Sequence, residues 1–237
     1  MMKKVDKNIV LEASKWSFDG NVNEYFDDHV KKSVPLYEEA HQLIGDFSDH
    51  FISNGSVIYD LGCSTGTLLK KLSMKHESVP NLTFIGLDIS KNMIQHSKKN
   101  CELKNVKFFY EDISKAALKP SSIVLSIYTM QFIRPKERQE IINNIYNSLE
   151  WGGAFFLFEK VRGSDARFQD IMQNAYTDFK LNNNFNSDEI INKTRSLKGV
   201  MEPFSREGNL GLLKRAGFED VESIFRYNCF EGYLAIK

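Results

Sequence analysis

Short apolar runs alternate with amphipathic segments along most of this chain. Apolar residues at spacings of three and four predict helices, and short apolar runs bounded by turn residues predict buried strands. By these criteria the expected strands cover residues 57–61, 82–87, 106–110, 123–127 and 154–159. The expected helices between them cover residues 67–74, 91–99 and 136–149, with Gly152 and Gly153 closing the last one. Strands that alternate with helices favour an α/β fold with a doubly wound, mostly parallel sheet.

The two ends of the chain add further elements to this sheet. Residues 12–52 carry apolar residues at helical spacing, and Pro35 is expected to start or kink a helix there. The tail predicts a helix over 210–216, followed by strands over 221–225 and 229–236. An N-terminal helical region and a two-stranded end of the sheet are therefore expected.

Residues 163–205 break the rhythm of the sheet. Their first part is helical and polar, and their second part is rich in Asn. We therefore expect a helical insertion that covers the substrate as a lid. No linker or internal repeat divides the chain, so residues 1–237 are expected to form a single domain.

Composition narrows the classes of function. Lys and Arg together number 31, as do Asp and Glu, so the net charge is zero. This balance favours a small-molecule substrate, with no direct nucleic-acid or membrane partner. Three cysteines without a CxxC spacing argue against a disulfide framework and against a metal site. We expect a cytoplasmic protein, and a homodimer stays open.

A glycine-containing turn follows the first expected strand. The residues Asp60-Leu61-Gly62-Cys63-Ser64-Thr65-Gly66 end that strand and lead into a helix. Glycine permits a tight backbone path and lets a ligand approach the chain closely. Structural glycines are common in such turns, so the turn by itself is weak evidence for a ligand.

Acidic residues at the next two strand ends strengthen the case. Asp88 ends the second expected strand, where its carboxylate can accept hydrogen bonds from both hydroxyls of a ribose. The string Glu111-Asp112-Ile113 follows the third expected strand, at a position where an adenine can be recognised. Asp112 would also suit a helix cap. Open α/β sheets bind ligands at this edge. Together the three sites predict a nucleoside cofactor.

The spacing of the turn and Asp88 resembles class I S-adenosylmethionine-dependent methyltransferases more than NAD enzymes, whose turn must also hold a pyrophosphate. Further strings resemble one subfamily, the carboxy-S-adenosylmethionine synthases. These strings are Trp16-Ser17-Phe18-Asp19, Ser33-Val34-Pro35-Leu36-Tyr37, Tyr59-Asp60-Leu61-Gly62-Cys63-Ser64, Tyr128-Thr129-Met130-Gln131-Phe132, Glu159-Lys160, Asp178-Phe179-Lys180 and Lys214-Arg215-Ala216-Gly217-Phe218.

The resemblance covers residues 15–237 and implies a Rossmann-like fold. It implies S-adenosyl-L-methionine, or its carboxylated derivative, as cofactor and prephenate as second substrate. The implied product feeds wobble-uridine modification of tRNA by another enzyme. The cofactor contacts that it implies are Tyr37, Gly62, Cys63, Ser64, Asp88, Ile89, Asp112 and Ile113, to which the turn itself adds Asp60 and Gly66.

Two departures from the family pattern concern the reacting groups. Ile127 stands where the family has Asn. Thr194 stands where the family has an arginine that holds the new carboxylate through two parallel hydrogen bonds. Arg195 follows one residue later, which on a helix turns the side chain by about 100°. Arg195 is therefore a candidate for the displaced carboxylate ligand.

Other residues are candidates for substrate contact. Tyr128, Arg162 and Tyr176 are each expected at or soon after a strand end that faces the predicted site. Cys63 is interpreted as a small turn residue, because no neighbouring His would activate its thiol as a nucleophile.

Three functions fit these features. The first is the cofactor-carboxylating synthase. The second is an ordinary methyltransferase, or a variant that uses the cofactor itself as substrate by intramolecular cyclisation, and the loss of the family arginine favours it. The third is a non-catalytic cofactor-binding module, against which the arginine-containing insertion argues.

Overall fold

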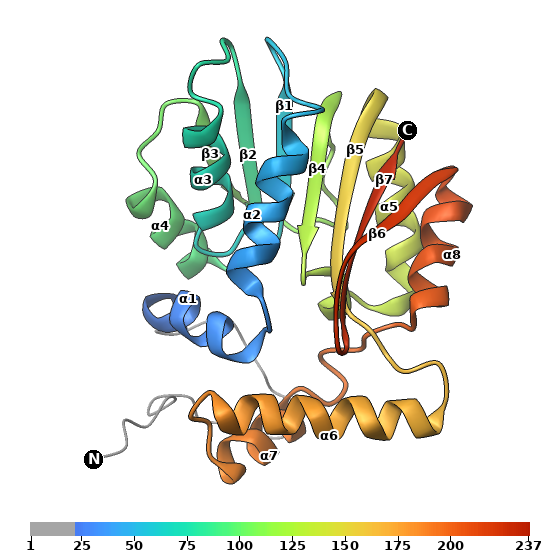
Figure 1. The fold of residues 1–237 in the computed structure, drawn as a ribbon. Coiled ribbons are helices and arrows are strands. Elements are labelled where there is room, and N and C mark those ends of the chain that lie inside the picture. Colours follow the sequence, from blue (N-terminus) through green and yellow to red (C-terminus); the bar gives the residue numbers. More distant parts are fainter. Residues whose placement is uncertain (1–21) are drawn as a thin grey trace.

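The computed structural model describes residues 22–237. Its strands are β1 (Val57–Leu61), β2 (Thr83–Asp88), β3 (Val106–Tyr110), β4 (Ser121–Ile127), β5 (Leu149–Lys160), β6 (Asp220–Tyr227) and β7 (Phe230–Ile236). They form one sheet in the order β3-β2-β1-β4-β5-β7-β6 (Figure 1). Strands β1 to β5 are parallel, whereas β7 runs antiparallel to both β5 and β6. The predicted mostly parallel sheet is confirmed.

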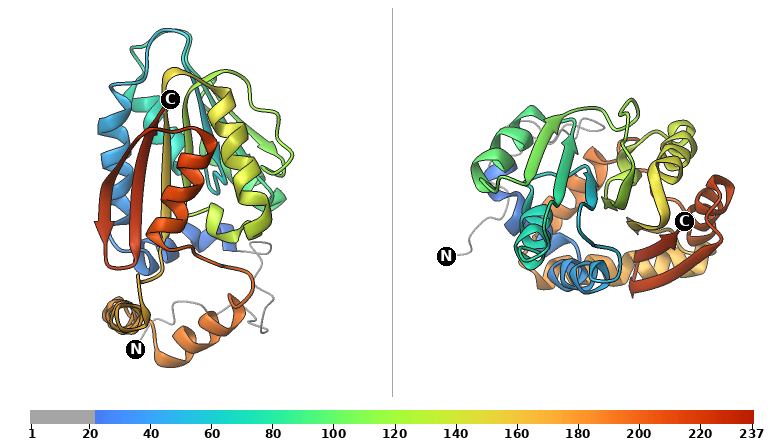
Figure 2. Two further views of the ribbon diagram at one scale, coloured as in Figure 1. Left: turned by 90° about the vertical axis from the view of Figure 1, so that its right-hand side faces the viewer. Right: turned by 90° about the horizontal axis from the view of Figure 1, so that it is seen from above.

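Eight helices surround this sheet in the described part of the chain. They are α1 (Val22–Ser33), α2 (Tyr37–Ser48), α3 (Thr67–Lys75), α4 (Lys91–Asn100), α5 (Pro135–Ser148), α6 (Ala166–Asn182), α7 (Ser187–Ser196) and α8 (Arg206–Ala216). Figure 2 shows helices on both sides of the sheet. None of them is long and apolar enough to span a membrane. Residues 12–21 of the expected helical region, and the family string at 16–19, lie outside the described residues.

The two faces of the sheet bury separate apolar clusters. On one face Phe156 packs with residues of α2, α3 and α4, and on the other face its neighbour Phe155 packs with residues of α5 and α8. Successive residues of a strand point to opposite faces, which is why adjacent phenylalanines join different clusters. Each fully buried side chain of this size contributes about 1.5–3 kcal/mol. The sheet is therefore doubly wound, with a core on each side.

Pro35 separates the first two helices, as predicted. α1 ends at Ser33 and α2 begins at Tyr37, and Leu36 between them has a positive φ of 53°. The junction places Tyr37 at the first turn of α2, at the end of the sheet where β1 turns into α3.

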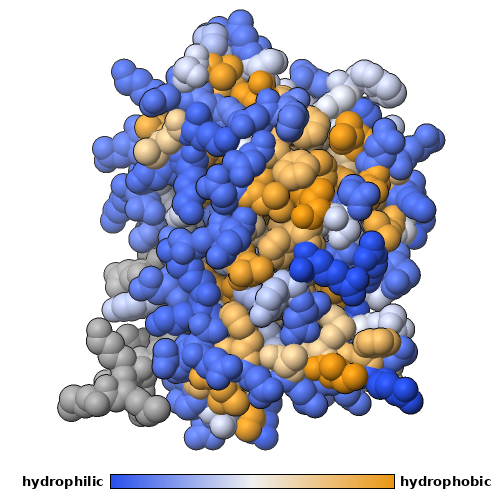
Figure 3. All heavy atoms as spheres, in the orientation of Figure 1, coloured by the Kyte–Doolittle hydropathy of each residue, from blue (hydrophilic) through white to orange (hydrophobic). Residues whose placement is uncertain are grey.

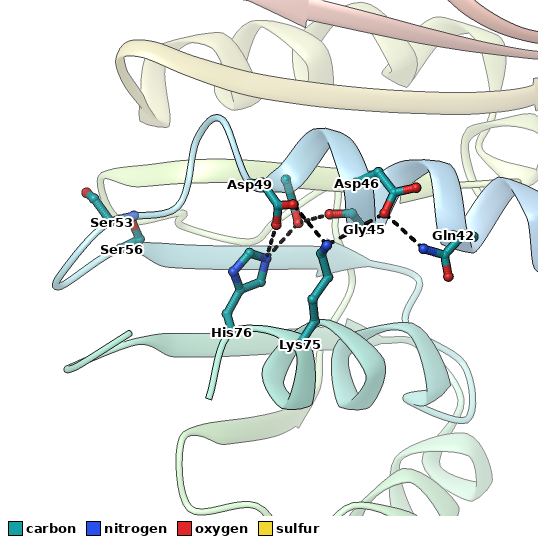
Figure 4. Close-up of polar contacts among 9 residues, drawn as sticks. Gln42, Gly45, Asp46, Asp49, Ser53, Ser56, Lys75 and His76 are labelled. Carbon is teal, nitrogen blue, oxygen red and sulfur yellow. Dashed lines mark hydrogen bonds and ion pairs between the residues drawn. The ribbon is translucent and has the colours of Figure 1, made fainter. Parts of the chain in front are cut away.

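Polar contacts at the far end of α2 fasten it to α3 (Figure 4). The hydroxyl of Ser48 lies 2.8 Å from Nε2 of His76, and Lys75 forms an ion pair with Asp49 at 3.0 Å. Burial lowers the pKa of His76, so its ring is neutral at physiological pH. These contacts fix the direction of α2 and hence the position of Tyr37.

The prediction that Gly152 and Gly153 close a helix is wrong. α5 ends at Ser148, and both glycines lie inside β5, which starts at Leu149. The amide of Gly152 donates to the Lys237 carbonyl at 2.7 Å, and the amide of Lys237 donates to the Gly153 carbonyl at 3.0 Å. The glycines therefore lengthen the strand by pairing it with the chain end.

The region 163–205 forms two helices, α6 and α7. The Asn-rich part is ordered by Asn186, whose side chain accepts from the Glu189 amide while the Glu189 carboxylate accepts from the Asn186 amide. α6 runs across the carboxyl ends of the parallel strands (Figure 1) and buries only Tyr176. Its exposed apolar residues are Phe168, Ile171 and Leu181. Figure 3 shows apolar surface along the lower edge of this face of the molecule.

Candidate cofactor site

The predicted turn lies where the order of strands reverses. β1 and β4 are parallel neighbours, and the chain leaves β1 toward β2 but leaves β4 toward β5. Gly62 has a φ of +83°, and a Cβ atom there would lie 2.3 Å from the Thr129 hydroxyl oxygen, just after β4. Gly62 is therefore required for the close approach of these two strand ends. Such a reversal point is the usual ligand site of open α/β sheets.

Asp88 joins the turn to the end of β2. Its Oδ2 accepts from the Ser64 amide at 2.9 Å, and its Oδ1 accepts from the Ser90 amide at 2.8 Å. A carboxylate offers about four lone-pair sites, so these two bonds orient the group and still leave acceptors for ribose hydroxyls. The geometry suits the predicted role of Asp88.

Ile89 and Asp112 flank this position. Ile89 is 64% exposed directly after Asp88, and it offers an apolar surface to a base. Asp112 accepts from both the amide and the hydroxyl of Ser114, at 3.0 and 2.8 Å, and it begins a turn instead of capping a helix. Ile113 is buried beneath this turn. The structure thus brings the three predicted strand ends to one edge.

Asp60 is a buried carboxylate at the end of β1. Burial, and after it the charge of Asp88, raises the pKa of Asp60 to about 7. No residue in the described part of the chain donates a hydrogen bond to its side chain. An opposite charge nearby would favour its ionised form. The site therefore suits a ligand that brings a cation, as the sulfonium and ammonium groups of S-adenosylmethionine do.

Tyr128 is held in an unusual conformation at the end of β4. It has a φ of +59°, which is uncommon for a residue with a side chain. Its hydroxyl is buried and has no hydrogen-bond partner in the described residues. Its ring lies 6.4 Å from that of Tyr37, centroid to centroid. A buried hydroxyl without a partner at a ligand-binding edge is typical of a group that bonds to the ligand.

Comparison with known proteins identifies this arrangement. Residues 58–153 match the model of a family described as Methyltransferase domain. Carboxy-S-adenosyl-L-methionine synthase of Staphylococcus epidermidis is 38% identical over 224 residues, which cover 94% of this chain and 97% of that protein. The synthase of Nautilia profundicola is 37% identical and covers 94% of each chain. This chain belongs to the carboxy-S-adenosyl-L-methionine synthase family.

Solved structures agree on the fold. Human N-acetylserotonin methyltransferase, in complex with S-adenosylmethionine, aligns with a TM-score of 0.62 at 16% identity, over 91% of this chain and 54% of that one. A TehB-like methyltransferase of Corynebacterium glutamicum aligns with a TM-score of 0.58 at 15% identity, over 92% and 96%. This member of the synthase family is therefore an S-adenosylmethionine-dependent transferase with the Rossmann-like fold of class I methyltransferases. S-adenosyl-L-methionine, or its carboxylated derivative, is its cofactor.

Several residues of this synthase-family chain differ from their predicted setting. Tyr176 lies in the middle of α6, where its ring packs against Lys160 at the end of β5, and its hydroxyl donates to the Ser33 carbonyl at 2.8 Å. Arg162 follows β5 but is exposed, and its Nε donates to the Pro203 carbonyl at 3.0 Å. Arg195 is exposed on α7. The Thr194 hydroxyl is used within α7, where it donates to the Ile190 carbonyl at 2.8 Å.

Cys63 is buried in the turn. Its side chain occupies the space that a Cβ atom at Gly86 would need. Burial, together with the charges of Asp60 and Asp88, raises the pKa of its thiol. The thiol therefore stays protonated, which agrees with its interpretation as a turn residue and not a nucleophile.

Sequence reasoning missed the contribution of α1. The carboxylate of Asp27 accepts from the hydroxyls of Thr65 and Thr67, both at 2.8 Å, and so joins α1 to the start of α3. Nothing in the sequence pairs residue 27 with residues 65 and 67, because the contact depends on how α1 packs. The contact therefore holds α1 beside the turn between β1 and α3.

Proposed function

We propose that this chain converts S-adenosylmethionine into its carboxylated sulfonium, with prephenate as the source of the carboxyl group. The observation that carries this proposal is the 38% identity to a carboxy-S-adenosyl-L-methionine synthase over nearly the full length of both chains. The buried Asp60 and the unpartnered hydroxyl of Tyr128 support it, because they suit a cationic, hydrogen-bonding ligand at the strand ends.

The proposed step balances without an oxidant or reductant. Prephenate loses carbon dioxide and hydroxide and becomes aromatic. The methyl group of the cofactor gives its proton to that hydroxide, and the resulting ylide carbon forms a bond to carbon dioxide. The protein's part is to align the two reactants and to exclude water from the ylide.

The test is mass spectrometry of the small molecule that copurifies with the protein, and of the product formed from S-adenosylmethionine and prephenate. Prephenate labelled with ¹³C in the carboxylate that is lost should transfer its label to the cofactor. Reactions without prephenate are the control. Unmodified cofactor in both experiments would contradict the proposal.

An ordinary methyltransferase is the second candidate. The exposure of Arg195, and the use of the Thr194 hydroxyl within α7, favour it. Methyl transfer needs no carboxylate ligand, and the acceptor's nucleophile would attack the cofactor methyl directly. Transfer of a labelled methyl group to an added small molecule, without prephenate, would support this candidate.

The cellular setting follows from the first candidate. We propose that the product is used by another enzyme that modifies tRNA, and that this chain works in the cytoplasm without touching the nucleic acid itself. Zero net charge and three buried free cysteines support this placement. Light scattering in solution would decide between a monomer and a homodimer.

A further inference from the structure

Two lysines lie over one buried tyrosine near the end of β5. Nζ of Lys160, the last residue of β5, is 4.4 Å from the centroid of the Tyr176 ring. Nζ of Lys180, one turn further along α6 than Tyr176, is 4.5 Å from the same centroid. We call these two residues the lysine pair. A tyrosine ring attracts a cation, but its attraction is weak compared with that of a carboxylate.

The lysine pair has no anionic partner. Within residues 25–237 neither ammonium group forms an ion pair with a carboxylate. The thiol of Cys229 is close enough to interact with both lysines, but burial raises its pKa, so it stays neutral. Burial, and after it the charge of Lys160, lowers the pKa of Lys180 to about 8. Two partly buried positive charges without a counterion lower the stability of the folded protein.

The lysine pair is connected to the cofactor site through Tyr128. The ring of Phe230 lies 5.3 Å from Tyr176 and 5.8 Å from Tyr128, centroid to centroid. The side chain of Gln131 accepts from the Lys160 amide at 3.1 Å and donates to the Tyr128 carbonyl at 3.1 Å. The pair, which lies between β5 and α6, is therefore linked to Tyr128 through Phe230 and Gln131.

We propose that the lysine pair binds a carboxylate of the second substrate. The ligand would supply the missing negative charge between β5 and α6, next to the tyrosine that faces the cofactor. This inference rests on the proposed function for the identity of the ligand, but the binding of an anion at the pair does not depend on it. It also supplies a carboxylate ligand in a chain where Thr194 stands in place of the family arginine.

Binding measurements on charge-removing variants test this inference. Lys160→Met and Lys180→Met keep the apolar stem and remove the charge, and Lys198→Met, at an exposed position after α7, is the matched control. Calorimetry in the presence of S-adenosylhomocysteine, which cannot react, gives the affinity for prephenate and for malonate, a simple dicarboxylate. Each variant of the pair should weaken binding of both anions at least tenfold, and the control should stay within twofold of wild type.

Removing one of two unpaired like charges should not unfold the protein. Thermal unfolding of both variants should match or exceed that of the wild type, and malonate should raise the midpoint only in the wild type and the control. Unchanged anion affinity in Lys160→Met and Lys180→Met would overturn the inference, as would a wild type that binds neither anion. An equal loss of affinity for S-adenosylhomocysteine would also overturn it, because the pair would then bind the carboxylate of the cofactor.

The proposed function fails in a different way. If the wild type binds malonate through the lysine pair but yields no carboxylated cofactor from prephenate, the reaction is wrong and the anion site stands. If labelled prephenate gives product with equal efficiency in wild type and in both variants, the reaction stands and the anion site is wrong.

Discussion

At the scale of single residues, Asp88 offers the most direct test of the cofactor site. Asp88→Ala removes a charged acceptor for the ribose hydroxyls and should weaken cofactor binding by about 1.5–3 kcal/mol, roughly 10- to 150-fold in Kd. Calorimetry measures this loss. Since Asp88 also accepts from Ser64 and Ser90, Asp88→Asn tests the ribose contact with less damage to the turn. Asp170→Ala on the exposed surface of α6 is the control, and wild-type affinity in Asp88→Ala would rule out the ribose assignment.

Arg195 separates the two candidate functions. If it binds the new carboxylate, the wild type should prefer the carboxylated cofactor over S-adenosylmethionine by at least tenfold, and Arg195→Ala should abolish the preference. Competition binding of the two cofactors gives this ratio. Arg167→Ala on α6 is the control and should leave the preference intact. A preference that also persists in Arg195→Ala would exclude Arg195 as the carboxylate ligand and favour the lysine pair.

The sequence was sufficient to locate site residues whose position follows from their place in a single strand. Asp60, Asp88 and Asp112 each end or follow a strand, and parallel strands bring their carboxyl ends together. No such rule places Asp27, Lys160 or Lys180, because their contacts join elements far apart in the chain. Tyr176 was predicted to follow a strand end, but it belongs to a helix and reaches the end of β5 only through the packing of α6.

At the scale of elements, Glu159 near the end of β5 makes stability depend on pH. The Met130 amide donates to its Oε1 at 3.0 Å, and burial raises its pKa from 4.5 to about 8. Between these values the folded protein keeps a proton that the unfolded chain releases. The free energy of unfolding therefore falls as the pH rises through this window.

Glu159→Gln should remove this dependence, because the amide stays neutral at every pH. Between pH 5 and pH 8, the free energy of unfolding of the variant should rise relative to that of the wild type by on the order of 1–3 kcal/mol. This change does not depend on how stable the variant is at pH 5. Urea unfolding at both pH values measures the difference. Glu150→Gln, at an exposed position of the same strand, should keep the wild-type slope. The prediction fails if the two variants share one slope.

The pattern of apolar positions located most elements but not all of their ends. β1 and β3 have the predicted bounds, because each is a short apolar run with polar flanks. β5 starts five residues earlier than predicted, since Glu150 to Gly153 look like a turn in the sequence but join the strand through pairing of Leu149 with Ser121 and of the glycines with Lys237. α7 was not foreseen, because its residues are polar and its order depends on the cap at Asn186.

At the scale of the whole molecule, we predict that residues 163–205 close over the reactants. α6 fully buries Tyr176 alone, with Met172 and Phe179 partly buried against the core, so its apolar contact is small enough for it to open and close. Hydrogen exchange in this segment should slow when S-adenosylhomocysteine and prephenate are both added, and less with either alone. Exchange in β4, which is buried throughout, serves as the reference. Equal exchange in all four conditions would contradict a lid.

The reversal of strand order between β1 and β4 separates the residues assigned to the cofactor from those assigned to the reaction. Every residue that we assign to the nucleoside lies in the half of the chain that ends with β3, or in the turn after it. The departures at Ile127 and Thr194, like the lysine pair, belong to the half that begins with β4. Mutation can therefore alter the chemistry in one half while selection for cofactor binding acts on the other. A chimera that takes residues 1–118 from this chain and the remainder from a relative should inherit its cofactor affinity from the first and its reaction from the second.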